Sequence, residues 1–403
     1  MKILILSTWF PYPCNQGSKI RAYHLIKALA SEHRLALISF EDQPIQPEWI
    51  EHIGEYCEEV KILPQAPFQY QRWKSLLGFF SLKPSAVYAG YSKEMENLVT
   101  SVAADWQPDL VFALTFVTAP YALKVPGVKR VVDMDNLLAL MLKEEIPMSK
   151  SISQRMRRTL AYLKFRYYED KIYSPFDYCI AVSDMDTNRV QQYTRIQPQQ
   201  VICVPNGVDL NYYQINGIAK NQHELVYSGA LTYLPNFDAM QFFLSEIFPM
   251  VQSEYPQSKL KITGKTNGFS TEHLRLNGNT FFTGYVDDIR PVVAEAEICI
   301  VPLRQGAGTR LKILEAMALG TSVVSTTKGA EGLDVRHGYD YLLADTPQEF
   351  AQSVIRLLKD QNLQKKLTLQ ARKTVEKTYN WEKIGAHFLE KVNLLSPQQD
   401  KNL

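Results

Sequence analysis

The sequence predicts an α/β protein made of two doubly wound, Rossmann-like domains that face a central cleft. Its 403 residues exceed one typical hydrophobic core and suit two domains. Short apolar runs alternate with amphipathic segments, which is the pattern of a parallel sheet covered by helices. This alternation breaks once, after Val204, in a polar, turn-rich stretch that begins with Pro205, Asn206 and Gly207. We therefore place the domain boundary there.

The apolar runs are the expected buried strands of the two sheets. In the first domain they are 3–7, 35–40, 60–63, 110–114, 130–133, 178–182 and 201–204. In the second domain they are 225–228, 259–263, 280–283, 298–302 and 322–325. Because ligands of such sheets bind beyond the carboxyl ends of the strands, we expect a binding site in the loops that follow these runs.

The expected organisation has four parts. Residues 1–205 form the first domain and residues 206–380 form the second. In 381–395, Trp381 and Phe388 belong to a series of apolar residues at helical spacing, which predicts a helix that binds to a domain surface. The last residues, 396–403, are polar and are expected to be disordered.

Composition excludes several classes of function. The formal net charge of +2 implies no bulk attraction to nucleic acid. Five cysteines form no C-x-x-C pair, and the seven scattered histidines form no metal-binding pair, so we expect a reducing cytoplasm and neither a metal nor another cofactor. No segment is apolar over the length that spans a bilayer, and the N-terminal run reads as a first strand rather than a signal peptide.

The stretch 298–320, ICIVPLRQGAGTRLKILEAMALG, is the most informative part of the chain. An apolar run, a loop with two glycines and a helix follow one another, which is the layout of a phosphate- and ribose-binding corner. Gly306 and Gly308 allow close approach of the backbone, and Thr309 is the expected N-cap of a helix that starts near Arg310. The amides of the first helical turn favour an anion there.

Charged side chains support this interpretation. Arg304, Arg310 and Lys312 add positive charge, which suits a diphosphate. Glu315 lies on an otherwise apolar helix face and needs polar partners, which two vicinal ribose hydroxyls would supply. The alternative is a buried ion pair between Glu315 and Arg310 or Lys312. The glycines and the strand before the helix favour the ligand role.

Two weaker features lie in the first domain. Gly17 precedes a helix at the end of the first strand; this is no G-x-G-x-x-G fingerprint, and alone it indicates only a turn. Asp133 and Asp135 follow a later strand and would orient a sugar hydroxyl or assist a proton transfer. The alternative for these acids is a turn with a side-chain cap.

The segment 149–171 mixes basic and aromatic residues. Such a segment would lie on an anionic membrane surface or meet a lipid-linked acceptor. More often such a segment is a long surface helix with one core-facing stripe, and we favour that interpretation.

Over nearly its whole length the chain resembles the family-4 glycosyltransferases, which have the GT-B fold. The motifs that carry the resemblance are FPYPCNQGSKIRAYHLIKALA, VVDMDN, YYEDKIYSPFDYCIAVSDMD, VPNGVD, LVYSGALTYLPNFDAMQFF, KITGK, FTGYVDDI and PLRQGAGTRLKILEAMALGTSVVSTTKGAEGL. The last is the most specific. Within the family the chain looks most like bacterial sugar transferases of exopolysaccharide and cell-envelope pathways.

The resemblance implies a retaining, metal-independent transfer of a sugar from a nucleotide-diphosphate donor, bound mostly by the second domain, to an acceptor on the first. Glu315 corresponds to the acid that holds the ribose, and the helix at Trp381 to one that packs back on the first domain. The implied catalytic residues are Asp135, Arg310 and Lys312. The implied donor-binding residues are Gly17, Tyr285, Val286, Arg304, Gly306, Ala307, Gly308, Thr309, Leu311 and Glu315.

The chain departs from the family pattern in three places. Ala307 stands where members often have a first glutamate, so main chain would contact the sugar. Ala230 and Asn236 stand near a common arginine and lysine, whose charge Arg304, Arg310, Lys312 or Lys265 would supply. Asp135 replaces a histidine near the reacting sugar.

The expected function is therefore transfer of a sugar from a nucleotide-diphosphate donor to a glycan or lipid-linked acceptor in the cytoplasm, with possible peripheral contact with the membrane. Two alternatives remain open. The first is a GT-B nucleotide-sugar epimerase, which would convert its donor without an acceptor. The second is a non-catalytic nucleotide-sugar-binding partner in an assembly complex.

Overall fold

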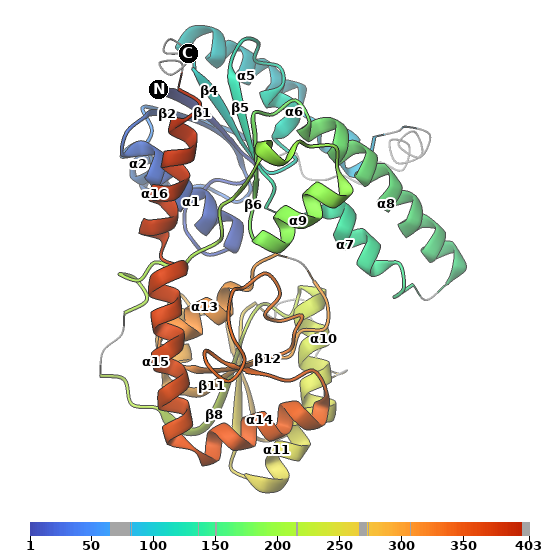
Figure 1. Ribbon diagram of the computed structural model, residues 1–403, viewed down its shortest axis with the longest axis vertical. Coiled ribbons are helices and arrows are strands. Elements are labelled where there is room, and N and C mark those ends of the chain that lie inside the picture. The colour runs from blue at the N-terminus through green and yellow to red at the C-terminus, as the bar shows by residue number, and fades with distance from the viewer. Residues whose placement is uncertain are drawn as a thin grey trace. The chain divides into compact units, whose positions relative to one another are not determined.

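A computed structural model describes residues 1–64, 81, 83–135, 137–149, 151–214, 217–265, 272, 274–306 and 308–396. The chain divides into two compact units (Figure 1). Unit 1 contains Met1–Pro205 together with Ile384–Leu403, and unit 2 contains Asn206–Lys383. Ala307 and the expected disordered residues 397–403 lie outside the described residues.

Unit 1 is built on a seven-stranded parallel sheet in the order β3-β2-β1-β4-β5-β6-β7. Its strands are β1 (Lys2–Ser7), β2 (Arg34–Glu41), β3 (Glu59–Pro64), β4 (Leu110–Leu114), β5 (Lys129–Asp133), β6 (Tyr178–Ala181) and β7 (Val201–Cys203). The helices around it are α1 (Gly17–Ala30), α2 (Pro47–Gly54), α4 (Ser85–Gly90), α5 (Lys93–Trp106), α6 (Ala119–Ala122), α7 (Leu138–Glu145), α8 (Ile152–Tyr173), α9 (Asp184–Tyr193) and the short η1 (Pro198–Gln200).

Unit 2 is built on a six-stranded parallel sheet in the order β10-β9-β8-β11-β12-β13. Its strands are β8 (Asn221–Ser228), β9 (Lys259–Thr263), β10 (Thr280–Gly284), β11 (Ala296–Val301), β12 (Ser322–Ser325) and β13 (Leu342–Leu343). Its helices are α10 (Leu234–Phe242), the π-helical η2 (Phe243–Ile247), α11 (Phe248–Glu254), α12 (Ile289–Glu295), α13 (Leu311–Ala318), α14 (Pro347–Lys359) and α15 (Gln361–Thr378).

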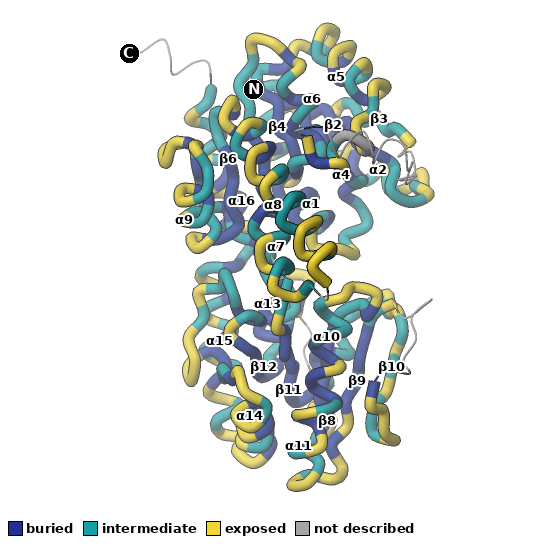
Figure 2. Tube along the Cα trace, turned by 90° about the vertical axis from the view of Figure 1, so that its right-hand side faces the viewer, coloured by how far each residue is buried: buried dark blue, intermediate teal, exposed yellow. Residues whose placement is uncertain are grey.

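Every apolar run predicted as a strand forms one, with ends that differ by a few residues. The reason is that helices cover both faces of a parallel sheet, so its strands carry uninterrupted apolar residues. In β11, for example, all residues are buried, and the central strands of unit 2 are dark blue in Figure 2. The two-residue strand β13 was not predicted, because so short a run carries no recognisable pattern.

Helix α16 (Trp381–Asn393) begins in unit 2 and belongs to unit 1 from Ile384 onward. Within unit 1 the ring of Phe388 lies 5.5 Å from that of Phe112. Gly385 allows close packing on α1, because a Cβ atom there would lie 2.9 Å from Cβ of Ala28.

Each sheet has a switch point where the strand order reverses. In unit 1 the switch lies between β1 and β4, and in unit 2 it lies between β8 and β11. Two adjacent strands whose connections leave in opposite directions create a crevice beyond their carboxyl ends, and ligands of open α/β sheets bind in this crevice. The predicted site residues follow β10 and β11 in unit 2 and β1 and β5 in unit 1.

Candidate functional site

The loop between β11 and α13 adopts a backbone that depends on its glycines. Gly306 has a φ of 104° and Gly308 a φ of 80°, both in the region that side chains disfavour. A Cβ atom on Gly306 would also lie 3.1 Å from Nη2 of Arg310 and 3.3 Å from Cβ of Pro235. These two glycines therefore let the loop turn tightly toward α10.

The start of α13 differs from the sequence prediction. The helix begins at Leu311, and the N-cap residue is Arg310 rather than Thr309. The Leu311 amide donates to the carbonyl oxygen of Thr309 at 3.1 Å, which forms a tight turn and places Thr309 before the cap. The Thr309 hydroxyl is buried and has no hydrogen-bond partner within the described part of the chain. The prediction that Thr309 caps this helix was therefore wrong, and one first-turn amide already has a backbone partner.

The ammonium group of Lys312 contacts two neutral side chains. Its ammonium nitrogen lies 4.0 Å from the centroid of the Tyr227 ring and donates to Oδ1 of Asn236 at 3.3 Å. The Tyr227 hydroxyl donates to the same amide oxygen at 2.7 Å, and the Asn236 amide group donates to the Ala230 carbonyl at 2.9 Å. Burial, and to a smaller degree the nearby Arg310, lowers the pKa of Lys312 to about 7. The ammonium group of Lys312 thus lies beside Asn236, one of the two positions that lack the family's common basic residues.

Glu315 is half-buried and is bound by a hydroxyl group. The Tyr213 phenol donates to Oε1 of Glu315 at 2.8 Å. Burial raises the pKa of Glu315, whereas this hydrogen bond and Lys312 act in the opposite direction. Among the described residues no ion pair joins Glu315 to Arg310 or Lys312, so the alternative of a buried ion pair is wrong. Sequence reasoning missed Tyr213, because nothing in the polar stretch after Val204 indicated its distant partner.

The other predicted residues of unit 2 lie at the same edge of the sheet but have different surroundings. Arg304 is bound by Asp238, with Nη2 and Oδ1 2.6 Å apart, and its guanidinium group lies 4.5 Å from the Phe242 ring centroid. Both contacts of the Arg304 guanidinium group are therefore with residues of α10. Tyr285 follows β10 and is exposed, and the Lys265 ammonium group lies 5.5 Å from its ring centroid.

Three predicted residues remain from this unit. Arg310 is nearly buried, and its Nη1 atom donates to the Gly308 carbonyl at 2.8 Å. Leu311 is partly buried and packs on the core of unit 2, which leaves its backbone rather than its side chain as the contact group. Val286, next to Tyr285, is partly buried.

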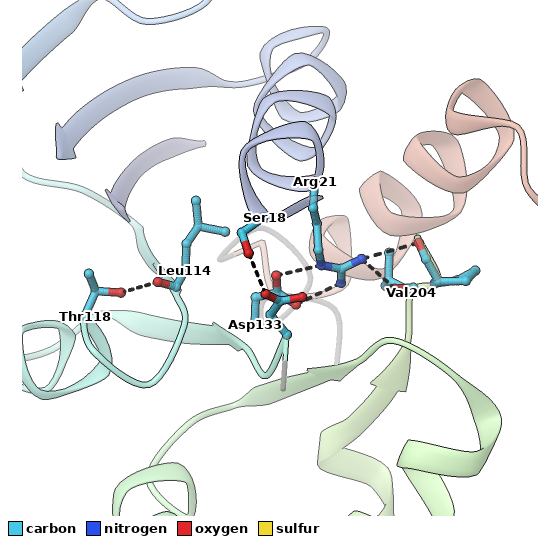
Figure 3. Close-up of polar contacts among 8 residues, drawn as sticks. Ser18, Arg21, Leu114, Thr118, Asp133 and Val204 are labelled. Atoms are coloured by element: carbon cyan, nitrogen blue, oxygen red, sulfur yellow. Dashed lines mark hydrogen bonds and ion pairs between the residues drawn. The ribbon is translucent and has the colours of Figure 1, made fainter. Parts of the chain in front are cut away.

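In unit 1 the acids at the end of β5 are bound by helix α1 (Figure 3). Arg21 contacts both oxygens of Asp133, at 2.7 Å from Nε and 2.8 Å from Nη2, and its Nη1 atom donates to the carbonyl oxygens of Val204 and Pro205. The Ser18 hydroxyl donates to Oδ2 of Asp135 at 2.9 Å. Asp133 is thus a buried ion-pair partner rather than a group available to substrate, and sequence reasoning missed its partner Arg21.

Asp135 lines a small pocket at the β1/β4 switch point, together with Ser7, Ser18 and Thr115. Burial and the Asp133 carboxylate raise the pKa of Asp135, against the opposing effects of Arg21 and Ser18. Thr115 has a φ of 80°, a strained conformation for a β-branched residue. Gly17, the first residue of α1, is exposed next to Ser18.

Where the chain is described, no three His, Cys, Asp or Glu side chains gather as metal ligands would. The described helices include none with the length and hydropathy needed to cross a bilayer.

Comparisons with known proteins extend over both units. Residues 16–212 match the family model described as Glycosyltransferase Family 4, and residues 222–360 match the model described as Glycosyl transferases group 1. An uncharacterized 44.6 kDa protein in the cps region of Klebsiella pneumoniae is 22% identical over 400 residues, which cover 95% of this chain and 97% of that protein.

Two solved structures share the fold. Sucrose-phosphate synthase from Thermosynechococcus elongatus superposes with a TM-score of 0.71 at 18% identity, covering 98% of this chain and 99% of that chain. HepE from Anabaena, solved in complex with UDP-glucose, superposes with a TM-score of 0.68 at 16% identity, with the same shares covered. Both units have Rossmann-like sheets. One family model matches most of the first part of unit 1, and the other matches most of unit 2. The chain therefore belongs to the family-4 glycosyltransferases and has their GT-B fold.

Proposed function

We propose that this glycosyltransferase moves a sugar from a nucleotide-diphosphate sugar to a glycan or lipid-linked acceptor in polysaccharide or cell-envelope biosynthesis. The transfer retains the configuration of the sugar and uses no metal. One observation carries the donor class: within the described residues a partly buried lysine, Lys312, lies at the β8/β11 switch point and donates its hydrogen bond to a neutral amide. A buried cation without a carboxylate in direct contact is costly, and an anionic ligand offsets that cost.

The groups around Lys312 suit a diphosphate in particular. Arg310 and Lys312 lie two residues apart at the start of α13, where the helix dipole also favours negative charge. Charge develops on the diphosphate as it leaves the sugar, so cations that are already in place stabilise the transition state. Arg310 and Lys312 thus act in place of a metal ion. Gly306, Gly308 and Thr309 provide the main chain that approaches the donor.

The carboxylate of Glu315 binds the ribose of the donor, and Tyr285 and Val286 bind its base. Glu315 is one helical turn from Lys312, so the two side chains can contact the ribose and the phosphates of one nucleotide. HepE, which shares the fold, was solved with UDP-glucose, and this supports a nucleotide-sugar donor here.

Unit 1 binds the acceptor. Asp135 and Ser18 are among the polar residues that line the pocket at the β1/β4 switch point, and a carboxyl group there orients a sugar hydroxyl. Because Arg21 already neutralises Asp133, the lining of this pocket has no excess positive charge, which suits a neutral hydroxyl better than a phosphate.

The test is binding and turnover with a panel of nucleotide sugars. We expect one member of the panel to raise the unfolding temperature of the wild-type protein, since a ligand that binds only the folded state stabilises it. Glu315→Gln and Lys312→Met should each weaken binding while the protein remains folded. Lys220→Met is the matched control, because Lys220 donates to Ala296 and Thr321 at the amino ends of the strands of the same sheet.

The outcomes separate the candidate functions. Release of nucleoside diphosphate that depends on an added glycan or lipid acceptor supports transfer. Conversion of the donor to another nucleotide sugar without acceptor would identify an epimerase, and binding without any turnover would identify a non-catalytic partner. Equal binding by wild type and both site variants would contradict the donor site.

We also propose a cytoplasmic location with peripheral contact between α8 and the anionic inner face of the membrane. Four apolar residues lie within one face of α8 and are exposed: Ile152 at 81%, Met156 at 68%, Leu163 at 53% and Tyr167 at 51%. Basic side chains flank this face, from residues Arg155, Arg157, Lys164 and Arg166. An exposed apolar stripe between basic residues matches the interface of an anionic bilayer. The five free cysteines are consistent with a reducing compartment.

Vesicle sedimentation tests this contact. Wild type should sediment with vesicles that contain phosphatidylglycerol and less with pure phosphatidylcholine. The double variant Ile152→Ser, Met156→Ser should remain in the supernatant, whereas Leu369→Ser, which changes an exposed leucine on α15, should not alter sedimentation. Equal sedimentation of all three proteins would exclude α8 as the contact.

A further inference from the structure

Tyr213 connects the stretch after the domain boundary to the candidate ribose-binding residue. Its hydroxyl donates to Oε1 of Glu315 at 2.8 Å across 102 residues of sequence. We propose that Tyr213 is a positioning residue that orients the Glu315 carboxylate and thereby sets the recognition of the donor's ribose hydroxyls. This inference rests on the proposed function of Glu315.

The backbone of Tyr213 is fixed on both sides. Its amide donates to the carbonyl oxygen of Asp209 at 2.8 Å. Its carbonyl oxygen accepts from Nη1 of Arg372 at 3.4 Å, and the same nitrogen donates to the carbonyl of Ala318 at 2.5 Å. Since Ala318 is the last residue of α13, Arg372 joins the backbone of Tyr213 to the helix that carries Glu315.

The neighbouring residue, Tyr212, is fixed by contacts of its ring and of its backbone with Arg290. The guanidinium group of Arg290 lies 3.9 Å from the ring centroid of Tyr212, and its Nη1 atom donates to the Tyr212 carbonyl at 2.7 Å. Asp288 in turn binds Arg290 through both of its carboxylate oxygens. The loop therefore brings a rigid phenol to Glu315, and only 9% of the Tyr213 residue is exposed.

This geometry determines what the carboxylate can accept. Burial raises the pKa of Tyr213 well above its usual value, so the phenol keeps its proton and acts as the donor to Glu315. An ionised carboxylate has about four acceptor positions on two oxygens. One position is used by Tyr213, and the remaining ones accept from two vicinal hydroxyls at a fixed angle. A carboxylate free to rotate would lose this preference for a diol.

A purely structural role makes a different prediction. If the hydrogen bond only satisfies Glu315 in the folded protein, its loss would affect nucleotides with and without ribose hydroxyls alike. If Tyr213 positions Glu315, its loss would affect only nucleotides that carry the hydroxyls. The ratio of the two affinities therefore separates the roles, and it is independent of small changes in stability.

The experiment is isothermal titration with UDP, GDP and ADP, and then with the 2′,3′-dideoxy form of the tightest binder. Wild type should prefer the ribonucleotide. Tyr213→Phe should lower this preference about tenfold, the effect of losing one hydrogen bond to a charged group. Glu315→Gln should lower it as well, and the double variant should lower it no further than Glu315→Gln alone. Tyr212→Phe, the matched control, should keep the wild-type ratio.

Two results would overturn the proposal, and they differ from each other. If Glu315→Gln lowers the preference but Tyr213→Phe does not, the positioning role of Tyr213 fails and the donor site stands. If the wild type shows no preference for the ribonucleotide, or Glu315→Gln leaves it unchanged, the ribose role of Glu315 fails, and the role of Tyr213 fails with it.

Discussion

Replacing Lys312 by methionine should have opposite effects on stability and on binding. Methionine is similar in length and has no charge, so it can fill the space beside the Tyr227 ring without a buried ammonium group. The free protein should therefore become more stable. A nucleoside diphosphate should bind more weakly, because the contact between the ammonium group and the phosphates is lost.

The size of the stability effect follows from the pKa of Lys312, which burial lowers from 10.5 to about 7. At pH 7 the unfolded chain holds this proton, whereas the folded protein holds it only half of the time. By linkage the buried amine costs at most about 4 kcal/mol at pH 7. This cost is largest below pH 7 and disappears as the pH rises past 10.5. The gain from Lys312→Met should shrink accordingly between pH 7 and pH 10.

The size of the binding effect follows from the lost hydrogen bond to a charged group, which contributes about 1.5–3 kcal/mol. Nucleoside diphosphate should bind roughly 10- to 150-fold more weakly to the variant. The nucleoside without phosphates should bind as it does to wild type. Urea unfolding at pH 7 and pH 10, together with titration by diphosphate and nucleoside, measures both effects, and Lys220→Met should leave binding unchanged.

Two results would refute the reasoning. Unchanged affinity for the diphosphate would show that Lys312 does not contact it. Equal loss of affinity for the nucleoside and the diphosphate would show that the substitution disturbs the site as a whole rather than removing one charge.

Three further variants test the surroundings of the two sites. Arg21→Met should lower the free energy of unfolding by about 3–5 kcal/mol, because it leaves the buried carboxylate of Asp133 without its partner; a loss below about 1 kcal/mol in urea unfolding would contradict this. Burial raises the pKa of Glu169 from 4.5 to about 7, so the folded protein loses stability as the pH rises through that window, and Glu169→Gln should stabilise it by up to about 3 kcal/mol at pH 8 and little at pH 4.5; equal effects at both pH values would argue against the shift. Gly264→Ala should destabilise unit 2 and weaken nucleotide binding, because its Cβ atom would lie 2.6 Å from the amide nitrogen of Ala230; normal unfolding and binding would show that the backbone after β8 can move.

The strands could be predicted from the sequence because a strand that is buried on both faces consists of consecutive apolar residues. The run 298–302 is an example: residues 298–301 form most of β11, and nothing in that strand is exposed. The loop with Gly306 and Gly308 after this strand was also predicted from the sequence, whereas the strand order that creates the switch point was not. The local sequence therefore predicts the strands and loops that carry each site.

The partners of the charged side chains could not be predicted in this way. Asp133 is bound by Arg21, 112 residues earlier, and Glu315 is bound by Tyr213, 102 residues earlier. These pairs depend on how the chain returns to the same point in space, which propensity and periodicity do not encode. The wrong N-cap at Thr309 has a local cause, because the tight turn between Thr309 and Leu311 shifts the helix start by one residue.

The central claim is that α13 and the loop before it bind the diphosphate and ribose of a nucleotide sugar. Hydrogen–deuterium exchange with and without the tightest-binding nucleotide sugar tests it most directly. We expect protection concentrated in 227–236 and 308–318, with protection of 209–213 as Tyr213 is held against Glu315. Protection confined to unit 1, or no change in these segments at saturating ligand, would contradict the account.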